Sequence, residues 1–147
     1  MSLSIDGTVL LARLRELGQT GRDSAGRLRR LAASDADKAG RDLFCGWLKE
    51  AGLAIEVDRI GNIYGMWSPA GASGAPVLMG SHIDTVIDAG IYDGCYGVMS
   101  GLAVIEALQR GGFRPSRPLA VAAFTNEEGV RYAPDMLTGL THGEGLR

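Results

Sequence analysis

The chain has 147 residues, a length that suits one domain with a hydrophobic core of its own. Hydrophobic residues make up 46% of the chain and charged residues 22%, and the formal net charge is −2. This balance is typical of a globular protein, excludes a polybasic nucleic-acid-binding surface, and leaves no apolar run long enough to span a membrane.

Apolar positions at helical spacing predict two helices in the first third of the chain. The first covers residues 5–17. The second follows Ser34, a plausible N-cap, has the acidic Asp35 and Asp37 in its first turn, and ends at Gly52. Acidic residues suit the first turn because the helix dipole is positive there.

The middle of the chain changes from helical to strand periodicity. Residues 53–58 alternate as a strand, Gly61-Asn62 predicts a turn, and residues 63–67 form a second predicted strand. A loop of small residues, 68–75, follows.

A short apolar run, 76–81, and a fully apolar run, 119–124, predict buried strands. A glycine-rich loop at 87–97 and an apolar helix at 98–108 lie between them. The order of helix, helix, three strands, helix and strand predicts an α/β fold with a mostly parallel sheet flanked by helices.

Polar residues follow these two buried strands, at the sheet edge where ligands bind in α/β folds. His82 comes directly after the first of them, and Asp84 lies on the same side of an extended chain. A carboxylate beside a metal-binding imidazole sets its tautomer. Taken alone, this pair is more often a satisfied histidine at a strand end.

Glu127 and Glu128 follow the second buried strand. Adjacent carboxylates there repel each other, and a metal ion would offset the repulsion. One glutamate could then bind the metal while the other accepts a proton from water. The alternative is a solvated loop with two surface glutamates.

Three further residues carry weaker signals. Asp93 opens a glycine-rich turn that could bring its carboxylate near His82, although turn or capping aspartates are common. Cys95 is expected to fill space rather than act as a nucleophile, and His142 is expected to be exposed. Cys45 and Cys95 lack metal or redox spacing, and no signal peptide is visible, so we expect free thiols and a cytoplasmic location.

Together these groups resemble the M20 metallopeptidase superfamily, and most closely its hydantoinase/carbamoylase branch, which includes N-carbamoyl-L-amino-acid hydrolases and allantoate amidohydrolases. The stretches that carry the resemblance are 58–65, 80–86, 90–102 and 123–136. The most specific is Phe124-Thr-Asn-Glu-Glu-Gly-Val-Arg-Tyr132, because aminopeptidase-type relatives usually have aspartate in place of Asn126.

The resemblance implies a role for each residue. His82, Asp93 and Glu128 would bind two divalent ions, zinc first with manganese or cobalt as alternatives, and Asp93 would bridge them. Glu127 would be the general base, and Asp84 would hold His82. The family reaction hydrolyses carbamoyl or ureido C–N bonds of small molecules, with no nucleic-acid or membrane partner.

The chain also departs from the family pattern. Members are several hundred residues long and contain an inserted dimerisation domain, two more metal-binding histidines and the substrate-binding residues. His142 is too close to Glu128 to match the next family histidine. We therefore expect residues 1–136 to be the N-terminal part of an incomplete dinuclear catalytic domain, and residues 137–147 to be a divergent or disordered tail.

These departures predict weak or no activity for the chain as it stands, and homodimers only for the full-length relatives. No residue here can be assigned to substrate binding. Two alternative functions remain, an M20 aminopeptidase or deacylase and a non-catalytic remnant with an exposed sheet edge.

Overall fold

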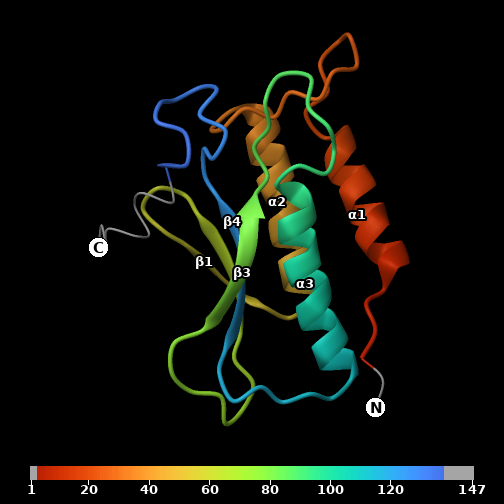
Figure 1. The fold of residues 1–147 in the computed structure, drawn as a ribbon, viewed down its shortest axis with the longest axis vertical. Coiled ribbons are helices and arrows are strands. Elements are labelled where there is room, and N and C mark those ends of the chain that lie inside the picture. The colour runs from red at the N-terminus through yellow and green to blue at the C-terminus, as the bar shows by residue number, and fades with distance from the viewer. Residues whose placement is uncertain (1–2, 138–147) are drawn as a thin grey trace.

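The computed structural model of the protein describes residues 3–137, and the elements of this part follow the predicted order (Figure 1). Residues 138–147, which make up most of the predicted tail and include His142, lie outside the described residues. The bounds of the elements are α1 Gly7–Gln19, α2 Asp35–Glu50, β1 Ala54–Val57, β2 Ile63–Trp67, β3 Val77–His82, α3 Cys95–Arg110 and β4 Leu119–Phe124.

Side-chain caps start two of the helices. The predicted N-cap Ser34 is confirmed, because its hydroxyl accepts a hydrogen bond from the backbone N–H of Asp37 at 3.2 Å. Asp6 caps α1 in the same way, so this helix begins at Gly7, two residues later than predicted. The third helix begins earlier than predicted, at Cys95, because the preceding glycine turns the chain directly into it.

The four strands form one mixed sheet in the order β1-β2-β4-β3. The α/β class is confirmed, but only β3 and β4 are parallel, whereas β1–β2 and β2–β4 are antiparallel. A parallel pair needs a crossover of about a dozen residues or more. The connection from β1 to β2 is too short for one, while α3 supplies the crossover between β3 and β4.

The three helices lie together on one side of the sheet, and the hydrophobic core fills the space between them (Figure 1). Val121 on β4 and Leu102 on α3 are fully buried there, together with Phe44 and Leu48 of α2. No helix of the described residues is long and apolar enough to cross a membrane. The prediction that residues 76–81 form a buried strand is wrong, because the outer side of β3 pairs with no described strand and its Val77 and Leu78 are exposed.

A close approach of backbones between β3 and β4 requires glycine at position 80. A Cβ at Gly80 would lie 2.5 Å from the carbonyl oxygen of Ala122, which the sheet holds in place. Gly80→Ala should therefore lower the free energy of unfolding by about 1–3 kcal/mol, as overpacking does elsewhere. Urea denaturation would measure this loss.

The matched control is Gly46→Ala in α2, because a Cβ at Gly46 meets no atom within 4 Å. Alanine is the better helix former, so this variant should be as stable as the parent or more stable by about 0.5–1 kcal/mol. Equal unfolding curves for the two variants would contradict the proposed backbone contact.

Candidate metal centre

The segment after β3 is buried although most of its residues are polar. His82, the last residue of β3, is 6% exposed, and Asp84 and Thr85 are each 3% exposed. Buried polar groups need partners, so the contacts of this segment indicate what holds it.

The backbone sets the tautomer of His82. Its Nδ1 lies 3.0 Å from the carbonyl oxygen of Asp84 and 3.6 Å from the carboxylate of the same residue. A carbonyl oxygen can only accept, so in the neutral ring Nδ1 carries the proton and Nε2 keeps a free lone pair. That is the form in which histidine binds a metal.

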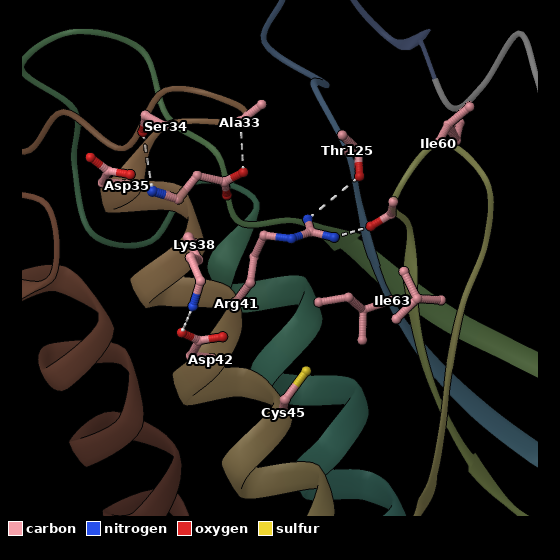
Figure 2. A pocket seen from close by; sticks show the side chains of 13 residues that line it. Ala33, Ser34, Asp35, Lys38, Arg41, Asp42, Cys45, Ile60, Ile63 and Thr125 are labelled. Atoms are coloured by element: carbon pink, nitrogen blue, oxygen red, sulfur yellow. Dashed lines mark hydrogen bonds and ion pairs between the residues drawn. The ribbon is translucent and has the colours of Figure 1, made fainter.

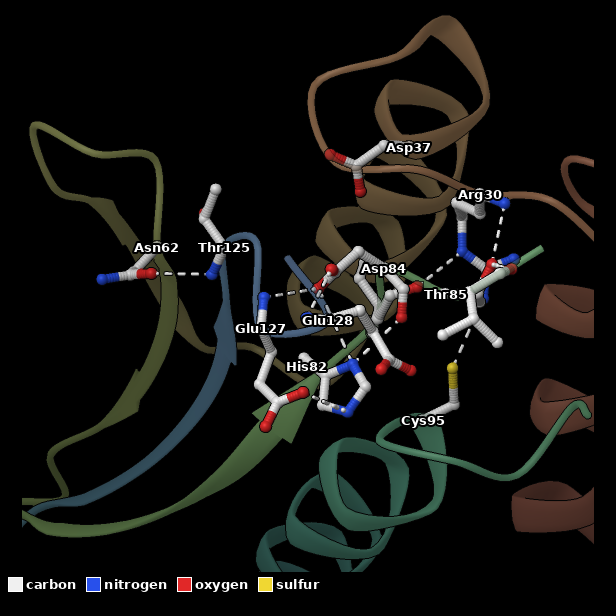
Figure 3. A network of polar contacts seen from close by, with 12 residues as sticks. Arg30, Asp37, Asn62, His82, Asp84, Thr85, Cys95, Thr125, Glu127 and Glu128 are labelled. Atoms are coloured by element: carbon white, nitrogen blue, oxygen red, sulfur yellow. Dashed lines mark hydrogen bonds and ion pairs between the residues drawn. The ribbon is translucent and has the colours of Figure 1, made fainter. Parts of the chain in front are cut away.

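The carboxylate of Asp84 has a different role from the predicted one. It accepts hydrogen bonds from the backbone N–H groups of Glu127 at 3.3 Å and Glu128 at 3.2 Å (Figure 3). Asp84 therefore ties the loop after β4 to the loop after β3. The backbone carbonyl of Asp84, rather than the predicted carboxylate, lies at hydrogen-bond distance from His82, and sequence reasoning missed the bonds to the glutamates.

The two glutamates lie close to the free nitrogen of His82. An oxygen of Glu127 is 3.5 Å from Nε2. Burial raises the pKa of Glu128 above its ordinary value, and Asp93, Glu127 and Asp84 raise it further, while His82 lowers it. Carboxylates that repel one another in this way are the groups that a divalent cation stabilises.

One imidazole nitrogen and two carboxylate oxygens, from His82, Glu127 and Glu128, lie within 4.8 Å of one another. This donor set suits zinc, and also manganese or cobalt. Room at the imidazole depends on Gly94, because a Cβ there would lie 2.4 Å from Nε2. The described residues therefore fit a divalent metal ion.

The structure does not bring Asp93 into this three-residue group. Its side chain is exposed at the start of the turn before α3, although it is close enough to raise the pKa of Glu128. Metal binding by Asp93 thus stays a prediction, whereas Glu127, the predicted base, lies among the candidate ligands.

Two further side chains shape the site. Asn126, with a φ of 56°, donates to the carbonyl oxygens of Tyr132 and Pro134 and so folds the loop after the glutamates back on itself. Cys95 is buried, and burial raises the pKa of its thiol, as expected for a residue that fills space rather than a nucleophile.

A groove of about 470 Å³ lies between α2 and the turn before β2 (Figure 2). Arg41 crosses it, donating to the carbonyl oxygen of Gly61 and, at 3.5 Å, to the hydroxyl of Thr125. None of the residues predicted to bind metal or catalyse lines this groove. Arg41 instead ties α2 to the end of β4, from which the glutamates follow.

Comparison with known families and proteins gives consistent matches. Residues 62–142 match the model of peptidase family M28, whereas the motifs pointed to M20. The chain is 43% identical over 129 residues to an allantoate deiminase of Arabidopsis thaliana, and 35% identical over 133 residues to an N-carbamoyl-L-amino acid amidohydrolase of Geobacillus stearothermophilus. These alignments cover 86% and 90% of the chain but only 24% and 32% of the relatives.

Solved structures agree. A hydantoinase/carbamoylase family amidase from Burkholderia ambifaria superposes with a TM-score of 0.92 at 42% identity, covering 98% of this chain and 36% of that one. A second such amidase, from Burkholderia multivorans, gives a TM-score of 0.92 at 40% identity. The chain thus spans about a quarter to a third of the length of the proteins it matches.

Proposed function

This chain belongs to peptidase family M28, and from that membership and its site geometry we propose that it forms the metal-holding part of a hydrolase for non-peptide C–N bonds. The predicted resemblance to the hydantoinase/carbamoylase branch is confirmed by its relatives and structural neighbours. We therefore propose N-carbamoyl-L-amino acids or allantoate-like ureido compounds as substrates.

The observation that carries this proposal is the free Nε2 of His82 facing the carboxylates of Glu127 and Glu128 across the ends of β3 and β4. A divalent metal held there would supply Lewis-acid activation of water and of the substrate carbonyl. Zinc is the first candidate, and His82, Asp93 and Glu128 would hold two such ions in the complete site.

The chain's own residues would transfer the proton and hold the transferring group in place. Glu127 would accept a proton from the attacking water and return it to the leaving nitrogen. Asp84 would keep both glutamates in place through their backbone N–H groups. One water and one carbamoyl substrate would give the free amine, carbon dioxide and ammonia.

Calorimetric titration of the chain with zinc tests the metal part of this proposal. Three protein ligands for two ions leave each ion undercoordinated, so we expect weak binding and little or no turnover by the chain alone. Failure to bind any divalent ion would contradict the proposed site, and tight binding of two ions would contradict its incompleteness.

The match to a peptidase family favours a second candidate, cleavage of peptide bonds. Steady-state assays on N-carbamoyl amino acids and on dipeptides distinguish the two, with the chain joined to the C-terminal part of a carbamoylase relative. Faster cleavage of dipeptides would support the peptidase alternative.

The exposed side of β3 favours a third candidate, a non-catalytic remnant. A sharp monomer peak in size-exclusion chromatography, together with cooperative unfolding, would count against this candidate.

We also propose a cytoplasmic location, because Cys45 and Cys95 are both free thiols. Homodimers are proposed only for full-length members of the family.

A further inference from the structure

A buried arginine that the proposed chemistry does not use lies behind the metal centre. The side chain of Arg30 is fully buried, and the atoms it bonds are neutral: three carbonyl oxygens and one sulfur. Among the described residues no carboxylate forms an ion pair with it. Burying a cation without a bonded partner of opposite charge is costly, so the position needs an explanation.

Arg30 holds the segment that carries His82 at two points. Its Nε donates at 2.7 Å to the carbonyl oxygen of Ile83, the residue between His82 and Asp84. Its backbone pairs with Thr85, because the N–H of Arg30 donates to the Thr85 hydroxyl at 2.8 Å and the N–H of Thr85 donates to the Arg30 carbonyl at 2.9 Å.

The same guanidinium reaches two other segments. One terminal nitrogen donates at 3.3 Å to the sulfur of Cys95, the first residue of α3. The other donates at 2.7 Å and 2.6 Å to the carbonyl oxygens of Leu17 and Thr20 at the end of α1, of which the Leu17 oxygen also accepts the backbone N–H of Thr20. Gly94, next to Cys95, lies against the imidazole of His82, so the start of α3 limits where that ring can sit.

We propose that Arg30 is a positioning residue for the metal centre. Its fork of donors fixes the segment after β3 and the start of α3 relative to each other, so that Nε2 of His82 faces Glu127 and Glu128 (Figure 3). Lysine cannot replace it, because an ammonium group on a flexible stem does not reach three directions at once. The inference rests on the proposed function in that metal binding is its main readout.

The test compares Arg30→Lys with Arg13→Lys. Arg13 is also mostly buried and bonds both oxygens of Glu106 at 2.8 Å, but it joins α1 to α3 away from the metal centre. Both variants should be less stable than the parent. If Arg30 positions the metal centre, metal binding should change in Arg30→Lys but not in Arg13→Lys.

Titration with Co²⁺, followed by its visible absorption at a temperature where each chain is folded, gives the readout. Arg30→Lys should weaken Co²⁺ binding by about 10–100-fold, the usual effect of losing a residue that orients a ligand, and should change the absorption spectrum. Arg13→Lys should match the parent in both. Parent-like affinity and spectrum in Arg30→Lys would overturn the inference.

A second readout needs no metal. Nitrogen-15 spectra of the imidazole rings report the tautomer of His82, which can be assigned because the chain has only two histidines. Loss of the Nδ1-protonated form in Arg30→Lys but not in Arg13→Lys supports the inference, and an unchanged tautomer overturns it. If the parent binds no Co²⁺, the proposed metal site fails and this spectrum alone decides the role of Arg30.

Cys95→Ala covers the case in which Arg30→Lys does not fold. It removes one of the contacts of Arg30 and leaves the guanidinium in place. We expect Co²⁺ binding weaker by about 2–10-fold, the effect of one lost hydrogen bond. Unchanged binding in Cys95→Ala would overturn the inference.

Discussion

Replacing Glu127 with glutamine should lower turnover by about 10²–10⁴-fold while leaving metal affinity close to that of the parent. Glutamine keeps the size of the side chain and an oxygen ligand but cannot accept a proton. The loss would be measured as kcat on an N-carbamoyl-L-amino acid, with this chain joined to the C-terminal part of a carbamoylase relative. Metal content would be measured on the same samples.

Glu128→Gln is the matched control, because it makes the same chemical change one residue away. It should lose metal together with activity, since Glu128 is the predicted ligand and its carboxylate lies in the same group. If Glu127→Gln loses the metal instead and Asp93→Asn keeps it, then Glu127 is a ligand. That outcome would contradict the assignment of Glu127 as the general base. It would favour His82, Glu127 and Glu128 as the metal ligands.

His82→Ala should weaken binding of Zn²⁺ or Co²⁺ by more than about 100-fold, beyond the 10–100-fold effect of losing an orienting partner. Among the described residues, His82 supplies the only nitrogen of the candidate site, and the bond from its Nδ1 to the carbonyl oxygen of Asp84 leaves Nε2 available for the metal. Removing the imidazole ring leaves only two carboxylates, which repel each other, among the described candidate ligands. Calorimetry would give the dissociation constants.

His142→Ala is the control for His82→Ala, because it removes the other histidine of the chain. It should bind the metal as the parent does. Loss of binding in both variants, or in His142→Ala alone, would show that the ion is held by a different set of residues.

The secondary-structure elements and the sheet edge at which the site lies follow from patterns in the sequence. The capping hydroxyl of Ser34, the buried strand β4 and the crossover helix are local patterns that the structure reproduces, whereas β3, which was predicted to be buried, is an exposed strand at the edge of the described sheet. Because parallel strands β3 and β4 end at the same edge, the residues that follow them had to meet. The sequence alone therefore predicts that His82 and Glu128 lie close together.

Strand directions and the detailed contacts of the site depend on how distant parts of the chain pack together. No local pattern distinguishes a parallel from an antiparallel partner for β2, which pairs with β4 from a distant part of the chain. The carboxylate of Asp84 turned out to bond the backbone after β4 rather than the ring of His82.

Arg30 gives the clearest case of this difference. In the sequence it is one of two adjacent arginines, and an arginine is usually expected at the surface. In the fold its guanidinium is fully buried and contacts Leu17, Ile83 and Cys95, residues 13, 53 and 65 positions away. Periodicity describes neighbours along the chain, whereas these contacts exist only once α1, the end of β3 and the start of α3 are packed together.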